Sequence, residues 1–268
     1  MRPLLQECWV LVVEAYRWSR RRWLAVVAWI GLLAAVGAVA WRYDHPVMLL
    51  NQQRFMDKER ISEQLAWDMF FQKVPVLAEV LHATPDPQRH EQQVRWLERH
   101  WSEYRLAGML RAWGAFVDVL SFTAVLLALG LGLRSVRLQR AACACLVAGL
   151  LAGVIANASR LSTGRPRPRH IENTGMADGF YGPHPLSFEM SSFPSGHVSA
   201  STGGAVALAV ALPVLAPVVL VSSAGVVWAC VWLNAHWTSD AAVGVGIGLG
   251  IGLLVGTRMR RRSGALGS

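Results

Sequence analysis

The segment Asn234-Ala-His236-Trp-Thr-Ser-Asp240 places a histidine and an aspartate four residues apart. If the segment is helical, the two side chains lie on one face of the helix. An aspartate that bonds one imidazole nitrogen fixes the tautomer and leaves the other nitrogen free to attack. Because the segment lies at the edge of apolar stretches, its ionisable groups indicate a functional site, with an interfacial polar cluster as the alternative.

The segment Phe193-Pro-Ser195-Gly196-His197 comes just before another apolar stretch. A turn of small residues at a helix N-terminus exposes backbone N–H groups where the helix dipole favours an anion. Ser195 adds a hydroxyl, and Gly196 lets a ligand approach the backbone closely. His197 can donate a proton near neutral pH. Taken alone, the segment is better explained as a capped helix with an incidental histidine.

A third stretch runs from Arg160 to Arg169 and contains four arginines and two prolines. The planar guanidinium of arginine suits phosphate oxygens. The prolines stiffen the backbone and so limit where the arginines can point. A basic loop that touches anionic lipid head groups would have the same composition.

The three stretches together are far more specific than any one of them. All fall on the same predicted membrane face. A phosphate bound between them would have an anion cradle, a nucleophile with an orienting carboxylate, and a proton donor for the leaving group. The combination predicts phosphoryl chemistry.

These stretches resemble the three-part signature of the type-2 phosphatidic acid phosphatase superfamily, which includes bacterial lipid phosphatases and vanadium haloperoxidases. The family pattern is Lys-x6-Arg-Pro, then Pro-Ser-Gly-His, then Ser-Arg-x5-His-x3-Asp. The second motif matches in full at 194–197, the third matches at His236 and Asp240, and the first matches at Arg167-Pro168. The resemblance covers residues 113–257, with a six-span helical core expected.

The resemblance implies a role for each matching residue. His236 would be the nucleophile that forms a phosphohistidine, Asp240 would orient it, and His197 would protonate the leaving group. The groups implied to hold the phosphate are Arg167, Ser195 and the Gly196 backbone. Such enzymes are similar in needing no metal, and we expect no cofactor.

Two positions depart from the family pattern. Arg160 stands where the first motif has lysine, which keeps the charge. Ala229-Cys230 stands where the third motif has Ser-Arg, so a phosphate-binding arginine is missing. Losing one such contact would cost about 2–4 kcal/mol, roughly 30- to 1000-fold in rate, if nothing replaces it. The candidate replacements are Arg165, Arg169 and Asn234.

Three functions stay open on this evidence. The first is hydrolysis of a lipid phosphate or pyrophosphate monoester, and the second is phosphotransfer to another lipid by the same residues. The third is binding of lipid phosphates or a scaffold role, with catalysis weakened by the change at Cys230. The presence of His197, His236 and Asp240 together favours an active enzyme.

The elements that must position these residues are membrane helices. The chain has 268 residues, of which 53% are hydrophobic and 16% charged, whereas soluble domains carry about a quarter charged residues. The net charge of +9 raises nucleic acid as a partner, but the arginines form short clusters that flank apolar segments, as membrane anchors do. We therefore expect no nucleic-acid partner. The four cysteines form neither a disulfide framework nor a zinc pattern.

The sequence predicts an all-α polytopic membrane protein with six transmembrane helices and a helical extracytoplasmic insert. The first span is 24–41, preceded by a cytoplasmic interfacial helix within 1–23. The other five spans, within 113–257, are Trp113–Leu133, Ala141–Ala158, Val198–Leu212, Val218–Leu233 and Ala241–Thr257. Glycines recur in the last span, where small residues allow close helix packing.

Residues 42–112 form the predicted insert. This segment holds ten basic and ten acidic residues and is too polar to span a membrane. Its length is unusual for a connection between spans, so we expect it to select substrates or to contact a protein partner or a second copy of the chain.

Orientation follows from the basic residues in short loops. Segments 1–23, 134–140 and the basic tail 258–268 carry 12 basic residues. The positive-inside rule places these segments, and both termini, in the cytoplasm. The loop 159–197 then lies outside, so the site would face the periplasm from a bacterial cytoplasmic membrane.

Overall fold

The computed structural model describes residues 2–51, 102–103, 105–171, 177–185 and 187–264. These residues form helices and loops with no strand, which confirms the predicted all-α class for the described part of the chain. Most of the predicted insert, residues 52–101 and 104, lies outside the described residues. The prediction that the insert selects substrates or contacts a partner also concerns these residues. The helices are α1 Arg2–Arg21, α2 Trp23–Trp41, α6 Asp118–Gly132, α7 Val136–Thr163, α9 Gly196–Ala211, α10 Ala216–Trp232 and α11 Thr238–Gly264.

Five helical segments of the described part are long and apolar enough to cross a bilayer, and the chain is an integral membrane protein. They are Trp23–Trp41, Arg105–Gly132, Val136–Thr163, Pro213–Trp232 and Thr238–Arg261. The second begins at Arg105, eight residues before the predicted Trp113. The predicted span Val198–Leu212 falls on α9, which has only 16 residues. At 1.5 Å per residue α9 is about 24 Å long, shorter than a hydrocarbon core of about 30 Å. Six full spans are therefore not confirmed.

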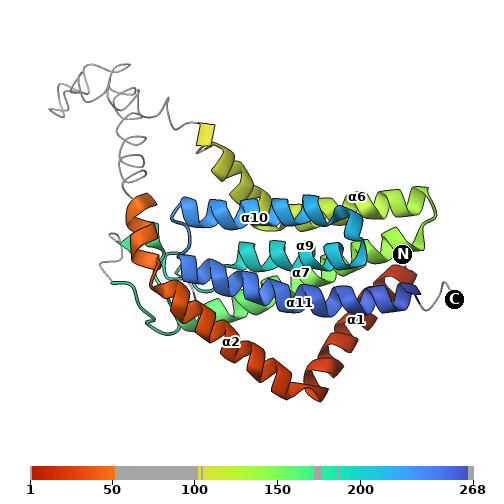
Figure 1. Cartoon of the computed structure of the whole chain (residues 1–268), viewed down its shortest axis with the longest axis horizontal. Helices are drawn as coiled ribbons and strands as arrows, with labels where there is room; N and C mark the ends of the chain where they lie inside the picture. Colours follow the sequence, from red (N-terminus) through yellow and green to blue (C-terminus); the bar gives the residue numbers. More distant parts are fainter. Residues whose placement is uncertain (1, 52–101, 104, 172–176, 186, 265–268) are drawn as a thin grey trace.

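Helix α9 lies inside the bundle. It packs against α7, α10 and α11, which surround it in Figure 1. Its first three turns are almost entirely buried and consist mostly of small residues, Gly196-His-Val-Ser-Ala-Ser-Thr-Gly-Gly. Because small side chains let helices approach closely in lipid, this composition suits a central helix. Because α9 runs along the bundle between these helices, its N-terminus lies at one end of the bundle.

The glycines of α11 pack against two different helices. A Cβ atom on Gly248 would lie 2.8 Å from the backbone N of Gly203 in α9, and one on Gly252 would lie 2.8 Å from the Gly203 carbonyl oxygen. A Cβ atom on Gly246 would lie 2.1 Å from Leu33 Cδ2 in α2. The glycines therefore let α9 and α2 approach α11 from two sides, as the packing interpretation predicted.

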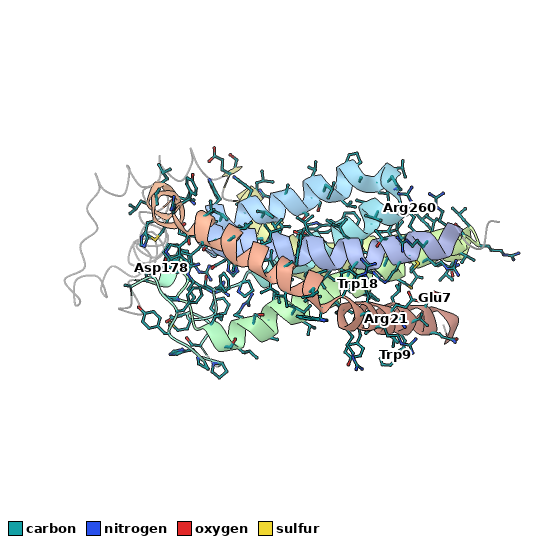
Figure 2. All side chains as sticks on the ribbon, turned by 60° about the horizontal axis from the view of Figure 1, so that its bottom comes forward. Glu7, Trp9, Trp18, Arg21, Asp178 and Arg260 are labelled. Carbon is teal, nitrogen blue, oxygen red and sulfur yellow. The ribbon has the colours of Figure 1, made fainter. Side chains whose placement is uncertain are left out.

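The predicted basic end of the bundle is held together by α1. Leu11 of α1 is 1% exposed and joins a cluster of α7 and α11 residues. Glu7 pairs with Arg140 at the start of α7 at 3.2 Å, and Arg258 of α11 lies 5.3 Å from the Trp18 ring centroid. Figure 2 shows Glu7 toward one end of the molecule and Asp178 at the other, with Trp18 between them.

The second span is kinked between Trp113 and Val117. This π-helical turn, η1, contains Ala115 with ψ 42° and Phe116 with φ 73°, both outside the helical region. A positive φ is unusual for a bulky residue. Bulges of this kind change the direction of a helix, and Figure 1 shows residues 105–112 leaving the line of α6.

We expect Gly248→Ala to lower thermal stability, because the new Cβ would meet the backbone of α9. Forcing extra atoms into a packed interface costs about 1–3 kcal/mol. The measurement is the midpoint of thermal unfolding in detergent. Gly31→Ala is the matched control, since nothing lies within 4 Å of the Cβ position of Gly31 in α2. Equal melting temperatures for the two variants would contradict the packing argument.

Candidate active site

The three stretches singled out in the sequence meet at one end of the bundle. His197 is the second residue of α9, and Asp240 lies in the first turn of α11. His236 lies in the turn between α10 and α11, and its ring centroid is 6.5 Å from that of His197. Arg160 belongs to the last turn of α7. The residues predicted to act together therefore come from the ends of three helices and a connecting turn.

His236 has one free ring nitrogen. The side chain is buried, and Nδ1 lies 2.9 Å from the Ser192 carbonyl oxygen. A carbonyl only accepts hydrogen bonds, so Nδ1 carries the proton and the lone pair is on Nε2. The Nε2 atom is buried without a hydrogen-bond partner. Burial lowers the pKa of His236 to about 3, although Asp240 opposes the shift, so the imidazole is neutral at pH 7.

Asp240 acts on His236 through Ser192. The Asp240 Oδ2 atom is 3.7 Å from His236 Nδ1, which is too long for the direct hydrogen bond we predicted. Instead, Oδ2 accepts hydrogen bonds from the Ser192 hydroxyl and from the Trp237 backbone N–H. The Ser192 carbonyl in turn accepts from His236. Ser192, which the sequence reasoning did not single out, therefore connects the carboxylate to the histidine.

Arg167 holds the loops around the site. Its Nε, Nη1 and Nη2 atoms donate to the carbonyl oxygens of Phe188, Ala235 and Ser191 at 3.0, 3.2 and 3.1 Å. A guanidinium has five N–H groups, so two remain for a ligand. Burial, aided by the charge of Arg160, lowers the pKa of Arg167 to about 9. Its charge is thus poorly compensated in the protein alone.

Several hydrogen-bonding groups around the N-terminus of α9 have no partner among the residues that the structure describes. They are Arg160 Nε, Ser195 Oγ and His236 Nε2. Ser195 is the N-cap residue of α9, yet its side chain does not cap the helix. A Cβ atom on Gly196 would lie 2.7 Å from Arg160 Nη2, so a larger residue here would displace the guanidinium from its present position. Buried polar groups are normally paired, and these groups together have the chemistry of an anion site.

Residues 141–263 match the family model of the PAP2 superfamily. This match over residues 141–263 supports membership in the type-2 phosphatidic acid phosphatase superfamily. The matched segment begins in α7 and ends in α11, and it includes every residue predicted for the site. Neither the curated proteins nor the solved structures gave a match to this chain. PAP2 proteins are generally phosphatases, which supports a phosphoric ester hydrolase.

Arg165, which we predicted as a replacement for the missing PAP2 arginine, has no donor left for a phosphate. Its Nε atom donates to Asp178, Nη1 to Ser239 and Asp240, and Nη2 to Asp44 and Asp178. All five N–H groups are therefore used. We remove Arg165 from the phosphate-binding set and call this group the Arg165 cluster: Arg165, Asp44, Asp178, Ser239 and Asp240.

The Arg165 cluster is buried at the site end of the bundle. Burial disfavours the charged guanidinium, but Asp240, Asp178 and Asp44 outweigh it and raise the pKa of Arg165. The Trp41 ring covers the guanidinium at 4.0 Å. Burial raises the pKa of Asp44, against the effect of Arg165 and Ser239. Neither Asp44 nor Asp178 belongs to a PAP2 motif, and no spacing pattern pointed to them.

Asn234 and Arg169, the other predicted replacements, belong to the loop structure. Asn234 has φ 48°, a left-handed conformation that asparagine tolerates. Its side-chain N–H₂ group donates to the Met48 carbonyl at 3.4 Å. Its backbone carbonyl accepts a hydrogen bond from the Arg169 backbone N–H. The Arg169 guanidinium lies over the Phe188 ring at 5.8 Å. Asn234 therefore supports the loop rather than a phosphate.

His197 is surrounded by positive charge. Burial lowers the pKa of His197 to about 4, and the next causes are Arg111, Arg160 and Arg167. Arg111 precedes the matched segment and was not identified from the sequence. For His197 to carry a proton near neutral pH, a nearby anion must raise its pKa again.

We expect Arg165→Lys to destabilise the protein, because an ammonium has three N–H donors and cannot replace the five hydrogen bonds of Arg165. Breaking a buried ion pair costs about 3–5 kcal/mol. Thermal unfolding in detergent measures the loss. Arg169→Lys, in the same loop but only half-buried, is the control. A melting temperature equal to that of the control would contradict the structural role.

The pH dependence of stability follows from His236. Its pKa falls from an ordinary value of 6.5 to about 3 on folding, so the unfolded chain binds more protons than the folded one as pH drops below 6.5. The free energy of unfolding should therefore be highest above that pH and fall as pH decreases toward 3. Between about pH 7.5 and 5, the melting temperature of His236→Asn should therefore fall by less than that of the wild type. An equal fall in both proteins would show that His236 is not the cause of the pH dependence, and His184→Asn is the control.

Proposed function

We propose that the protein hydrolyses a phosphate or pyrophosphate monoester on a membrane lipid through a phosphohistidine at His236. The observation that carries the proposal is the His236 Nε2 atom, which is buried, deprotonated and without a partner, next to unpartnered donors. A neutral imidazole whose lone pair is not engaged in a hydrogen bond is a competent nucleophile. The donors of Arg160, Ser195 and Arg167 would hold the phosphate oxygens.

The reaction we propose has two steps. His236 Nε2 attacks phosphorus, the bond from phosphorus to the lipid oxygen breaks, and His197 gives its proton to the departing oxygen. A water molecule then attacks the phosphohistidine, and His197 takes a proton from that water. Inorganic phosphate leaves, and the Nε2 lone pair is restored. Asp240 and Ser192 keep Nδ1 protonated throughout and favour the positive charge that develops on the ring.

The phosphate itself would make His197 competent as an acid. In the unliganded site burial and three arginines lower the pKa of His197 to about 4. A bound phosphate dianion offsets those charges and raises the pKa again. Substrate binding and protonation of His197 are then coupled.

Two features support a lipid as the carrier of the phosphate. The site lies at the end of a bundle of membrane helices, where a lipid head group can reach it. The described parts of the basic clusters, residues 2–23, 134–140 and 258–264, lie away from the site, around the contacts of Glu7 with Arg140 and of Arg258 with Trp18. By the positive-inside rule we propose that both termini are cytoplasmic and that the site faces the periplasm of a bacterium.

The test is release of inorganic phosphate by purified protein in detergent without added metal. The substrates are phosphatidate, phosphatidylglycerophosphate, a polyprenyl pyrophosphate and phosphorylated lipid A. We expect His236→Ala to abolish release and His197→Ala to reduce it about 10²–10⁴-fold. His184→Ala, outside the motifs, is the control. Release that persists in His236→Ala would refute the mechanism.

The same experiment separates the other two functions. Label that moves from the donor to an acceptor lipid, rather than to inorganic phosphate, would show a phosphotransferase. Failure to release or transfer phosphate from every substrate, in protein that still binds inorganic phosphate, would show a binding protein.

A further inference from the structure

The position of the missing PAP2 arginine lies directly beneath the site. Cys230 is fully buried in α10, packed with Val198 and Ala241 from the first turns of α9 and α11. Its carbonyl accepts from the backbone N–H of His236 at 3.1 Å. A cationic group is therefore expected here, and the thiol does not supply one.

Helix residues 105–112 lie against α10 at the level of Cys230. Ala107 is fully buried and clusters with Ala229 and Trp232, and Leu110 packs on the same cluster. A Cβ atom on Gly114 would lie 2.2 Å from Val226 Cγ1. Residues spaced by three or four share a helix face, so the face that carries 107, 110, 111 and 114 is turned toward α10.

Arg111 lies on this face, between Ala107 and Gly114. Its positive charge acts on both Cys230 and His197. Its Nε atom is buried and has no hydrogen-bond partner among the described residues. Arg111 therefore combines a place on the face toward α10, a charge felt at His197 and Cys230, and an open donor.

The kink of the second span accounts for this placement. Trp113 packs on the cluster around Cys230, and its Nε1–H donates to Ser222 Oγ in α10 at 2.9 Å. Phe116, which has the positive φ, instead packs against a second cluster, whose residues include members of α6, α7 and α9. Bulged helical turns are frequent at functional sites. Here the bulge lets one span contact α10 near the site and α7 further along.

We propose that Arg111 binds the substrate phosphate in place of the arginine that the PAP2 third motif carries at the position of Cys230. The guanidinium reaches the site from the second span instead of from α10, and it contributes its charge and open N–H groups to the phosphate oxygens. This inference rests on the proposed function, since it assigns a further residue to the same phosphate site.

The first experiment measures phosphate binding without turnover. We expect inorganic phosphate to raise the melting temperature of the wild type and of His236→Ala, because ligands that bind the folded state stabilise it. Arg111→Gln, which keeps the length of the side chain, should lose most of this increase. Arg105→Gln is the matched control, since Arg105 lies on the same helix and is exposed. An increase in Arg111→Gln equal to that of the control would overturn the proposal.

The second experiment moves the charge back to α10. Arg111→Ala should reduce phosphate release about 10²–10³-fold, the usual cost of removing one donor to a developing charge. Adding Cys230→Arg to Arg111→Ala should recover at least about tenfold, because a guanidinium would again face the phosphate. Phosphate release by Arg111→Ala at the wild-type rate would also overturn the inference. Loss of release in all proteins, with Arg111-dependent phosphate binding intact, would instead refute only the proposed hydrolysis.

Discussion

The buried pairing of Arg165 with three carboxylates is the interaction on which the site depends. Taking these charges out of water is costly, and the cost is offset only when every donor is satisfied. Arg165 meets that condition, since each of its five N–H groups reaches an oxygen. Its partners come from the segment after α2, from the loop near 178 and from the start of α11. The cluster therefore joins the first span to the PAP2 helices, and it sets the position of Asp240.

The position of His236 follows from that of Asp240. The carboxylate holds the Ser192 hydroxyl, and the Ser192 carbonyl holds the protonated nitrogen of the ring. The opposite nitrogen is left without a partner in a buried environment. His236 is therefore oriented by a chain of contacts that begins at Arg165, an arginine whose five N–H groups are all used within the protein.

The arginines near the site differ in how many of their N–H groups already have a hydrogen-bond partner. Arg165 is saturated, Arg167 keeps two N–H groups, and Arg160 and Arg111 each have an unpartnered Nε. The last three lower the pKa of His197, as expected where positive charge is in excess. A phosphate would satisfy the open donors and reverse the effect on His197. The short, enclosed α9 makes this possible, because its N-terminus opens into the same group of donors.

The sequence by itself determined the membrane class and the two histidines, because both depend on local properties. Long apolar runs and flanking arginines identify membrane helices, and the spacings at 194–197 and 236–240 identify the PAP2 motifs. Only the tertiary structure decided what each arginine does. Arginines have the same chemistry in a sequence, and their roles depend on which donors distant residues occupy. Asp44 is 121 residues from Arg165, yet it turns that arginine into a structural cation. Arg111 precedes the motifs, and only the packing of its kinked helix on Ala229 and Trp232 turns its face toward α10.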